Sequence, residues 1–251
     1  MLERKNFQFE ICANSVESCI EAMKGGADRV ELCASIPEGG TTPSYGEIKV
    51  ARRLLTKTRL HVIIRPRGGD FLYSPLEIER MKEDIAICRE LGVDGVVFGC
   101  LTPEGDIDMN ANEYLVKEAE GMSKTFHRAF DRCVHPEEAI EDIINLGFNR
   151  ILTSGQQPTA EEGIKLLAKL EKQADGRIGI MAGCGVNENN IRKIYEATHI
   201  SQYHFSARSP QKSKMMRFNS SVFMGAKGVE EDTINVTSSQ RVKDTISHCL
   251  G

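Results

Sequence analysis

The sequence predicts a single (β/α)8 barrel, the TIM-barrel form of the α/β class. Three observations support this prediction. A short β-rich run followed by a helical pattern recurs eight times along the 251 residues. No Gly/Ser-rich linker or change of composition divides the chain. Eight parallel strands exceed the roughly five or six of a typical open doubly wound sheet, and single barrels commonly have about this chain length.

The expected strands are short runs bounded by Gly, Asn, Ser or Pro. They cover residues 7–13, 29–34, 60–66, 95–101, 125–130, 150–154, 178–182 and 203–207. Helical periodicity lies between them, for example at 16–24, 48–55, 76–91, 139–146 and 161–173. Four helices are expected to end at a glycine in the left-handed conformation: Gly25, Gly92, Gly147 and Gly176.

The segment 209–240 departs from this alternation. It is rich in Ser, Lys, Asn and Gly and contains the pair Met215-Met216. Long irregular stretches in compact domains are usually functional, so we expect a lid or an oligomer contact. A last helix is expected at 241–249. The predicted single domain therefore spans residues 1–251, with an irregular tail at 209–240.

Composition and charge exclude several classes of protein. Lys plus Arg number 32 and Asp plus Glu number 36, so the net charge is −4, without the basic excess of a nucleic-acid-binding protein. No apolar run approaches the roughly 18 residues that cross a bilayer, and the charged N-terminus is unlike a secretory signal. The eight cysteines form no C-x-x-C pair and no disulfide-rich pattern. We therefore expect a cytoplasmic protein without nucleic-acid or membrane partners.

Strand alternation predicts an unusually polar barrel lumen. On the first strand Phe7, Phe9 and Ile11 face the helices, which leaves Gln8, Glu10 and Cys12 inward. The same period of two points further sets inward: Arg29, Glu31 and Cys33; His61, Arg65 and Arg67; Thr125, His127 and Asp131; His204, Ser206 and Arg208. In one interpretation a ring of ion pairs only stabilises the barrel, formed by Glu10, Glu31, Arg29 and Arg65. In the other, these groups bind a ligand at the strand C-termini, where barrel active sites lie.

Two inward cysteines are expected to be neighbours. Cys12 and Cys33 lie near the ends of the first two strands, each two residues after a Glu. Adjacent strands are about 4.8 Å apart, so two thiolates at equal height can share one soft ion such as Cu(I), which accepts linear two-sulfur coordination. The alternative is that both cysteines are small buried apolar residues.

A glycine-rich loop at 182–187 follows the seventh strand. Loops after strands seven and eight of such barrels commonly bind phosphate, which makes Gly183 and Gly185 candidate ligand-binding residues. A tight turn capped by Asn187 explains the same residues without a ligand. Both interpretations stay open.

Nine motifs between residues 7 and 209 carry a resemblance to a known family. In chain order they are EICANSVES (10–18), GGADRVELC (25–33), GGTTPSYG (39–46), IRPRGGDF (64–71), DGVVFGCLTPEGDID (94–108), TFHRAFD (125–131), RILTSG (150–155), IMAGCGV (180–186) and HFSARS (204–209). Together they resemble the copper homeostasis protein CutC family. The resemblance implies a cytoplasmic (β/α)8 barrel that forms homo-oligomers, dimers or tetramers, and binds copper. The cysteines proposed for Cu(I) in that family fall on Cys12 and Cys33.

Two hypotheses of function follow. The first is a cytoplasmic copper-homeostasis protein that holds Cu(I) between Cys12 and Cys33. The second is an enzyme acting on a small carboxylate or phosphate metabolite, with these candidate catalytic residues: Glu10, Glu31, Arg65 and His127. Candidate ligand-binding residues are Arg67, Asp131, Gly183, Gly185, His204 and Arg208. No inward Lys ends a strand and no inward H-x-H lies on the first strand, which argues against a Schiff base and a binuclear zinc hydrolase.

Overall fold

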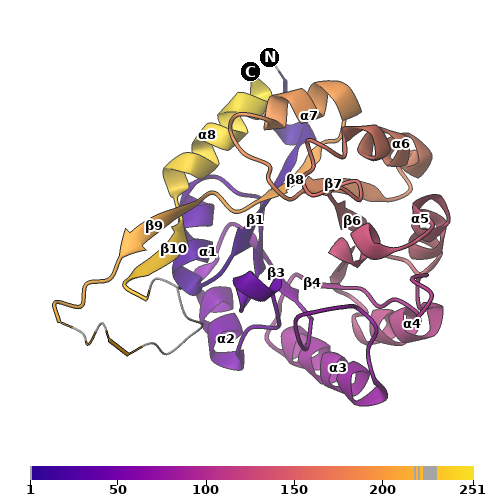
Figure 1. The fold of residues 1–251 in the computed structure, drawn as a ribbon, viewed down its shortest axis with the longest axis horizontal. Coiled ribbons are helices and arrows are strands. Elements are labelled where there is room, and N and C mark those ends of the chain that lie inside the picture. The colour runs from indigo at the N-terminus through magenta and orange to yellow at the C-terminus, as the bar shows by residue number, and fades with distance from the viewer. Residues whose placement is uncertain (1, 218, 220, 223–230) are drawn as a thin grey trace.

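The predicted barrel is present in the structure. A computed structural model describes residues 2–217, 219, 221–222 and 231–251. Each barrel strand pairs in parallel with the next along the chain, and β8 pairs with β1 to close the barrel (Figure 1). The strands are β1 (Gln8–Ala13), β2 (Arg29–Leu32), β3 (Arg59–Ile63), β4 (Gly95–Phe98), β5 (Ser123–Phe126), β6 (Arg150–Thr153), β7 (Gly179–Gly183) and β8 (Gln202–Phe205).

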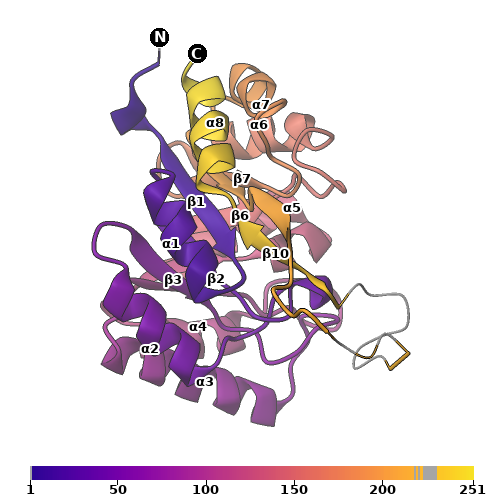
Figure 2. The same ribbon diagram turned by 90° about the vertical axis from the view of Figure 1, so that its left-hand side faces the viewer.

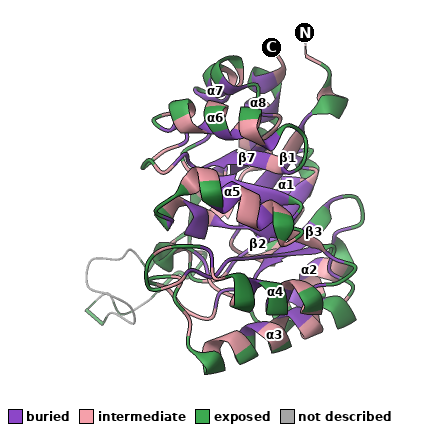
Figure 3. Ribbon diagram, turned by 90° about the vertical axis from the view of Figure 1, so that its right-hand side faces the viewer, coloured by how far each residue is buried: buried purple, intermediate pink, exposed green. Residues whose placement is uncertain are grey.

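An outer layer of helices surrounds these strands. Its members are α1 (Val16–Lys24), α2 (Tyr45–Leu54), α3 (Pro75–Glu90), α4 (Met109–Glu118), α5 (Pro136–Asn145), α6 (Ile164–Ala174), α7 (Ile191–Thr198) and α8 (Ser239–Leu250). Exposed surface lies on the outer faces of the helices, while the strands are buried (Figure 3). Local chemistry sets the helix starts. Ser74 and Glu77 form a complete capping box at α3, with Pro75 as the first helical residue.

The apolar core lies between the strands and the helices. Phe9 and Ile11 of β1 are fully buried members of this core. Glu10, between them in sequence, contacts Arg29 of β2 and His204 of β8 inside the barrel. The two faces of β1 are therefore sorted as the period of two predicts.

The turn after α1 differs from the expectation by one residue. Gly25 has an ordinary helical φ of −74°, and Gly26 adopts the left-handed conformation with φ of +90°. The left-handed residue that ends α1 is therefore Gly26, the second glycine of the pair. Gly25 instead lies against α8.

The segment expected to be wholly irregular contains two strands. β9 (Arg208–Lys212) and β10 (Thr233–Thr237) pair antiparallel as a two-stranded sheet beside the barrel (Figure 2). The expected irregularity at 209–240 was therefore wrong for both strands, and residues 218, 220 and 223–230 lie outside the described residues. The expected last helix is α8, which packs against α1 and α7. Among the described residues, no helix has the length and apolar character needed to cross a membrane.

Candidate functional site

A cavity of about 490 Å³ lies at the C-terminal ends of the barrel strands. Its wall includes Cys12 at the end of β1, Cys33 after β2, Arg65 after β3 and His127 after β5. The turn at Gly185 after β7 and the segment that follows β8 complete the wall. This is the end of the barrel at which (β/α)8 enzymes place their sites.

A closed ion pair lies deep in the barrel. Glu10 pairs with Arg29, and both side chains are almost completely buried. Although burial raises the pKa of Glu10, the charge of Arg29, with smaller effects of His204 and His61, lowers it to about 2. This carboxylate is therefore ionised at neutral pH and held by its arginine. That half of the predicted structural ring is confirmed.

The other half of the predicted ring was wrong. Glu31 pairs with His204, whose Nε2 lies 2.8 Å from the Glu31 carboxylate, and Arg65 takes no part. Burial raises the pKa of Glu31. Burial alone would lower the pKa of His204, but hydrogen bonds to Cys12 and Glu31 raise it well above its usual value. His204 is thus a cation on the cavity wall.

Cys12 and Cys33 are neighbours, as predicted. Their Sγ atoms lie 4.0 Å apart, and Arg208 Nη2 lies 3.2 Å from the Cys12 sulfur. A hydrogen bond from Cys33, with His204 and the charge of Arg208, lowers the pKa of Cys12 well below that of a free thiol. The same hydrogen bond raises the pKa of Cys33. Loss of a proton from the pair is therefore favoured at Cys12 and disfavoured at Cys33.

Arg65 and His127 lie on the same cavity wall. The Arg65 guanidinium donates to the carbonyl oxygens of Glu38, Gly40 and Gly69 at 2.8 to 2.9 Å. His127 Nδ1 accepts a hydrogen bond from the Ala129 N–H at 3.3 Å. Arg65 Nε and His127 Nε2 are buried and have no hydrogen-bond partner among the described residues.

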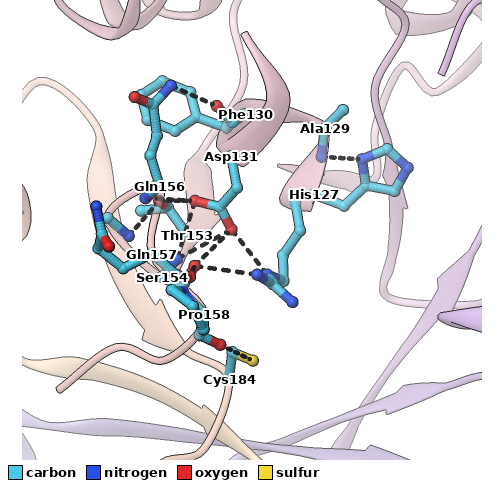
Figure 4. Close-up of polar contacts among 12 residues, drawn as sticks. His127, Ala129, Phe130, Asp131, Thr153, Ser154, Gln156, Gln157, Pro158 and Cys184 are labelled. Atoms are coloured by element: carbon cyan, nitrogen blue, oxygen red, sulfur yellow. Dashed lines mark hydrogen bonds and ion pairs between the residues drawn. The ribbon is translucent and has the colours of Figure 1, made fainter. Parts of the chain in front are cut away.

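Four predicted site residues are outside the cavity wall, and the first is the candidate catalytic residue Glu10, which lies deeper in its ion pair with Arg29. Arg67 pairs with Glu77 and Asp70 on the surface side of the loop after β3. The Asp131 carboxylate binds Ser154, Gln156, Thr153 and Arg128, which consumes its acceptors (Figure 4). Gly183 is not part of the wall either, and the Leu152 side chain occupies the space into which a Cβ atom at Gly183 would point. Of the two glycines proposed to bind phosphate, only Gly185, with φ of +73°, lines the cavity, together with other residues of its loop: Cys184, Val186 and Asn187.

Several side chains of the wall were not among the predicted site residues, and they include three large aromatic or charged groups. Phe71, Arg128 and Arg241 line the cavity. Phe71 and Arg128 belong to the IRPRGGDF and TFHRAFD motifs, so the motifs were the available signal for them. Arg241 lies in the first turn of α8 and had no such signal, because only the folded chain brings α8 to the barrel mouth.

Comparisons with known proteins agree with the sequence motifs. The profile described as "CutC family" matches residues 7–209. A "family protein CutC" of Bacteroides thetaiotaomicron is 63% identical over 243 residues, covering 96% of this chain and 98% of the relative. A "family protein CutC" of Chromobacterium violaceum is 50% identical, covering 93% of this chain and 94% of the relative.

Solved structures also match this chain, one of them from the same family and another by its fold alone. A CutC crystal structure from Streptococcus agalactiae, named for a proposed role in copper homeostasis, is 38% identical with a TM-score of 0.77, covering 80% of this chain and 98% of that one. A thiamine phosphate pyrophosphorylase of Pyrococcus furiosus covers 99% of both chains with a TM-score of 0.61, but at 18% identity it shows the shared fold alone. Matched along most of its length by the family profile and by these relatives, the chain belongs to the CutC family.

Proposed function

We propose that this protein takes part in copper homeostasis in the cytoplasm by binding Cu(I) between the thiolates of Cys12 and Cys33. The observation that carries the proposal is the 4.0 Å separation of the two Sγ atoms at the cavity wall. Thiolate sulfur is the ligand that Cu(I) prefers in proteins. The copper homeostasis role in the name of the Streptococcus agalactiae relative supports the same assignment.

The spacing of the sulfurs favours a bent site over a linear one. Metal–thiolate bonds of about 2.3 Å that span this gap enclose an angle of roughly 120°. That angle suits three ligands, and a Glu31 carboxylate oxygen lies within 4.8 Å of both sulfurs. A linear site, as the sequence suggested, needs the sulfurs to move apart by roughly 0.6 Å. We therefore propose Glu31 as the third ligand.

The surrounding charges favour a monovalent ion. Two thiolates, the Glu31 carboxylate and one Cu(I) ion carry a net charge of −2, which Arg208 and a protonated His204 beside these ligands balance. Zn(II) takes four ligands in a tetrahedron, whereas the cluster of Cys12, Glu31 and Cys33 offers three. The site is therefore expected to prefer Cu(I) over Zn(II).

A competition titration with a Cu(I)-specific chelator, under anaerobic reducing conditions, tests the proposal. Wild type should bind one ion per chain, and Cys12→Ser and Cys33→Ser should each weaken binding by at least about 100-fold, because each removes a direct ligand. Glu31→Gln should weaken binding less. Cys184→Ser is the matched control, since Cys184 lines the same cavity away from the pair, and should bind as wild type does.

Retained affinity in both Cys12→Ser and Cys33→Ser would contradict the proposal. X-ray absorption at the copper edge provides a second readout of the same site. It should report two sulfur neighbours and one oxygen in wild type, and the oxygen should disappear in Glu31→Gln. A two-sulfur site in wild type would favour the linear geometry and remove Glu31 from the ligand set.

A further inference from the structure

Arg65 is a buried cation without an anionic partner in the described part of the chain. Its side chain is 4% exposed, and its three hydrogen-bond acceptors are uncharged backbone carbonyls. No ion pair among the described residues includes Arg65, whereas the equally buried Arg29 is paired with Glu10. A buried charge is costly unless an opposite charge compensates it. The Arg65 position is therefore suited to an anion from outside the chain.

His127 supplies a second donor with a defined tautomer. Burial, helped by the charge of Arg65, lowers the pKa of His127 to about 3, so the ring is neutral at neutral pH. Its Nδ1 accepts from Ala129, as Figure 4 shows, so the single ring proton lies on Nε2. That nitrogen is buried and has no hydrogen-bond partner within the residues that the structure describes. An unsatisfied buried donor of this kind is rare in folded proteins.

The other charges of the cavity wall are already matched. Arg128 is paired with Asp131, and Arg241 is paired with Glu188. Arg208 lies against the Cys12 sulfur. Arg65 is therefore the cation of the described wall whose charge no neighbouring anion balances.

The cavity also offers volume and apolar surface. A volume of about 490 Å³ exceeds the need of one metal ion and falls within the roughly 300 to 1,000 Å³ typical of small-molecule sites. Ile63 and Leu152 contribute apolar wall. Phe71 packs on both donors, with its ring 5.0 Å from the Arg65 guanidinium carbon and 4.9 Å from the His127 ring. Its ring therefore covers part of both donors.

We propose that this cavity binds a small organic carboxylate, whose oxygens accept hydrogen bonds from Arg65 Nε and His127 Nε2. One monocation and one neutral donor match the charge and the two oxygens of a carboxylate. A phosphate dianion would keep a surplus charge and unmatched oxygens here. The inference does not rest on copper binding, because neither donor belongs to the thiol pair.

The test uses acetate, propionate and benzoate as probes, with acetamide, propionamide and benzamide as neutral counterparts. Binding is followed by 15N NMR of the arginine Nε and histidine ring nitrogens in the full-length protein. The carboxylates should shift the signals of Arg65 Nε and His127 Nε2 in a saturable way. The amides should bind at least about tenfold more weakly, because they lose the charge-assisted hydrogen bond.

Two variants probe the donors separately. Arg65→Lys keeps the charge but removes Nε, and His127→Asn keeps an acceptor for the Ala129 N–H but removes the distal donor. Each should weaken carboxylate binding by about tenfold or more, measured by calorimetry. Arg67→Lys is the matched control, because Arg67 lies in the same loop but outside the cavity wall, and should bind as wild type does.

Equal binding of acids and amides, or unchanged signals at high millimolar acetate, would overturn the proposal. Tighter binding of inorganic phosphate than of every carboxylate would overturn the choice of ligand class. The double variant Cys12→Ser with Cys33→Ser separates the two proposals. It should lose Cu(I) binding and keep the acetate-dependent shifts.

Discussion

Single buried residues divide the barrel interior into two layers with different chemistry. Glu10 and Arg29 satisfy one another below the cavity. Arg65 and His127, at the level of the cavity, each keep a buried nitrogen that has no partner among the described residues. Because an orphaned buried donor costs free energy, the lower layer serves stability and the upper layer is available for ligands.

The protonation of His127 makes a prediction about acid stability. Its pKa is about 3 in the folded chain, against 6.5 for an unperturbed histidine. Between these values the unfolded chain binds more protons, so stability is lost as the pH falls from 6.5 toward 3. His127→Asn should therefore lose less stability than wild type across this window in denaturant titrations. The exposed His248→Asn is the control, and a His127→Asn profile parallel to wild type would contradict the assignment.

At the scale of elements, α8 fills the gap between α1 and α7 and brings Arg241 to the cavity wall. Its fit depends on one close approach. A Cβ atom on Gly25 would lie 2.5 Å from the Val242 Cβ and 3.0 Å from the Ser239 carbonyl oxygen. The glycine at the end of α1 is thus required by packing against α8, since its φ of −74° suits any residue.

A pair of glycine substitutions tests this close approach. Gly25→Ala should destabilise the protein by about 1 to 3 kcal/mol, because the added methyl group overpacks the α1–α8 contact. Gly46→Ala in α2 is the matched control. The nearest atom to its new Cβ is 3.9 Å away, so it should stabilise the protein by about 0.4 to 1 kcal/mol. Thermal melts of both variants measure the difference, and equal melting temperatures would show that α8 adapts.

For the whole molecule, the polar layer near the barrel centre links the strands that close it. Glu10 of β1 contacts Arg29 of β2, His61 of β3 and His204 of β8. Charges in a barrel interior are tolerated only when they are paired. The Glu10–Arg29 ion pair therefore affects the stability of the entire barrel. Homo-oligomer formation stays a prediction at this scale.

Replacing one or both members of the pair measures that effect. Glu10→Gln should cost about 3 to 5 kcal/mol, because Arg29 is left buried without its carboxylate, out of a total stability of about 5 to 15 kcal/mol. The double variant Glu10→Leu with Arg29→Met should lose less stability than the sum of the losses in the single variants Glu10→Leu and Arg29→Met. Glu141→Gln, which removes an exposed partner of Arg177, should change stability little. Additive losses in denaturant unfolding would show that the two residues are not coupled.

The sequence alone determined the barrel, the inward faces of its strands and the proximity of Cys12 and Cys33. Alternation within a strand is a local property, so it can be read from a few consecutive residues. It becomes unreliable with distance from a strand end. Arg65 and His127 lie just after β3 and β5 and still line the cavity, as predicted. The inward directions expected for Arg67 and Asp131, further along the same loops, were wrong.

Only the tertiary structure decided which polar groups meet. Glu31 pairs with His204, which is 173 positions away along the chain, because barrel closure brings β8 beside β1, whose other neighbour is β2. The same closure places α8 at the cavity wall and leaves Arg65 without an anion. Partner choice depends on strand register and burial, which are properties of the closed barrel as a whole. The direction of a strand side chain is therefore encoded locally, whereas its partner is set by the fold.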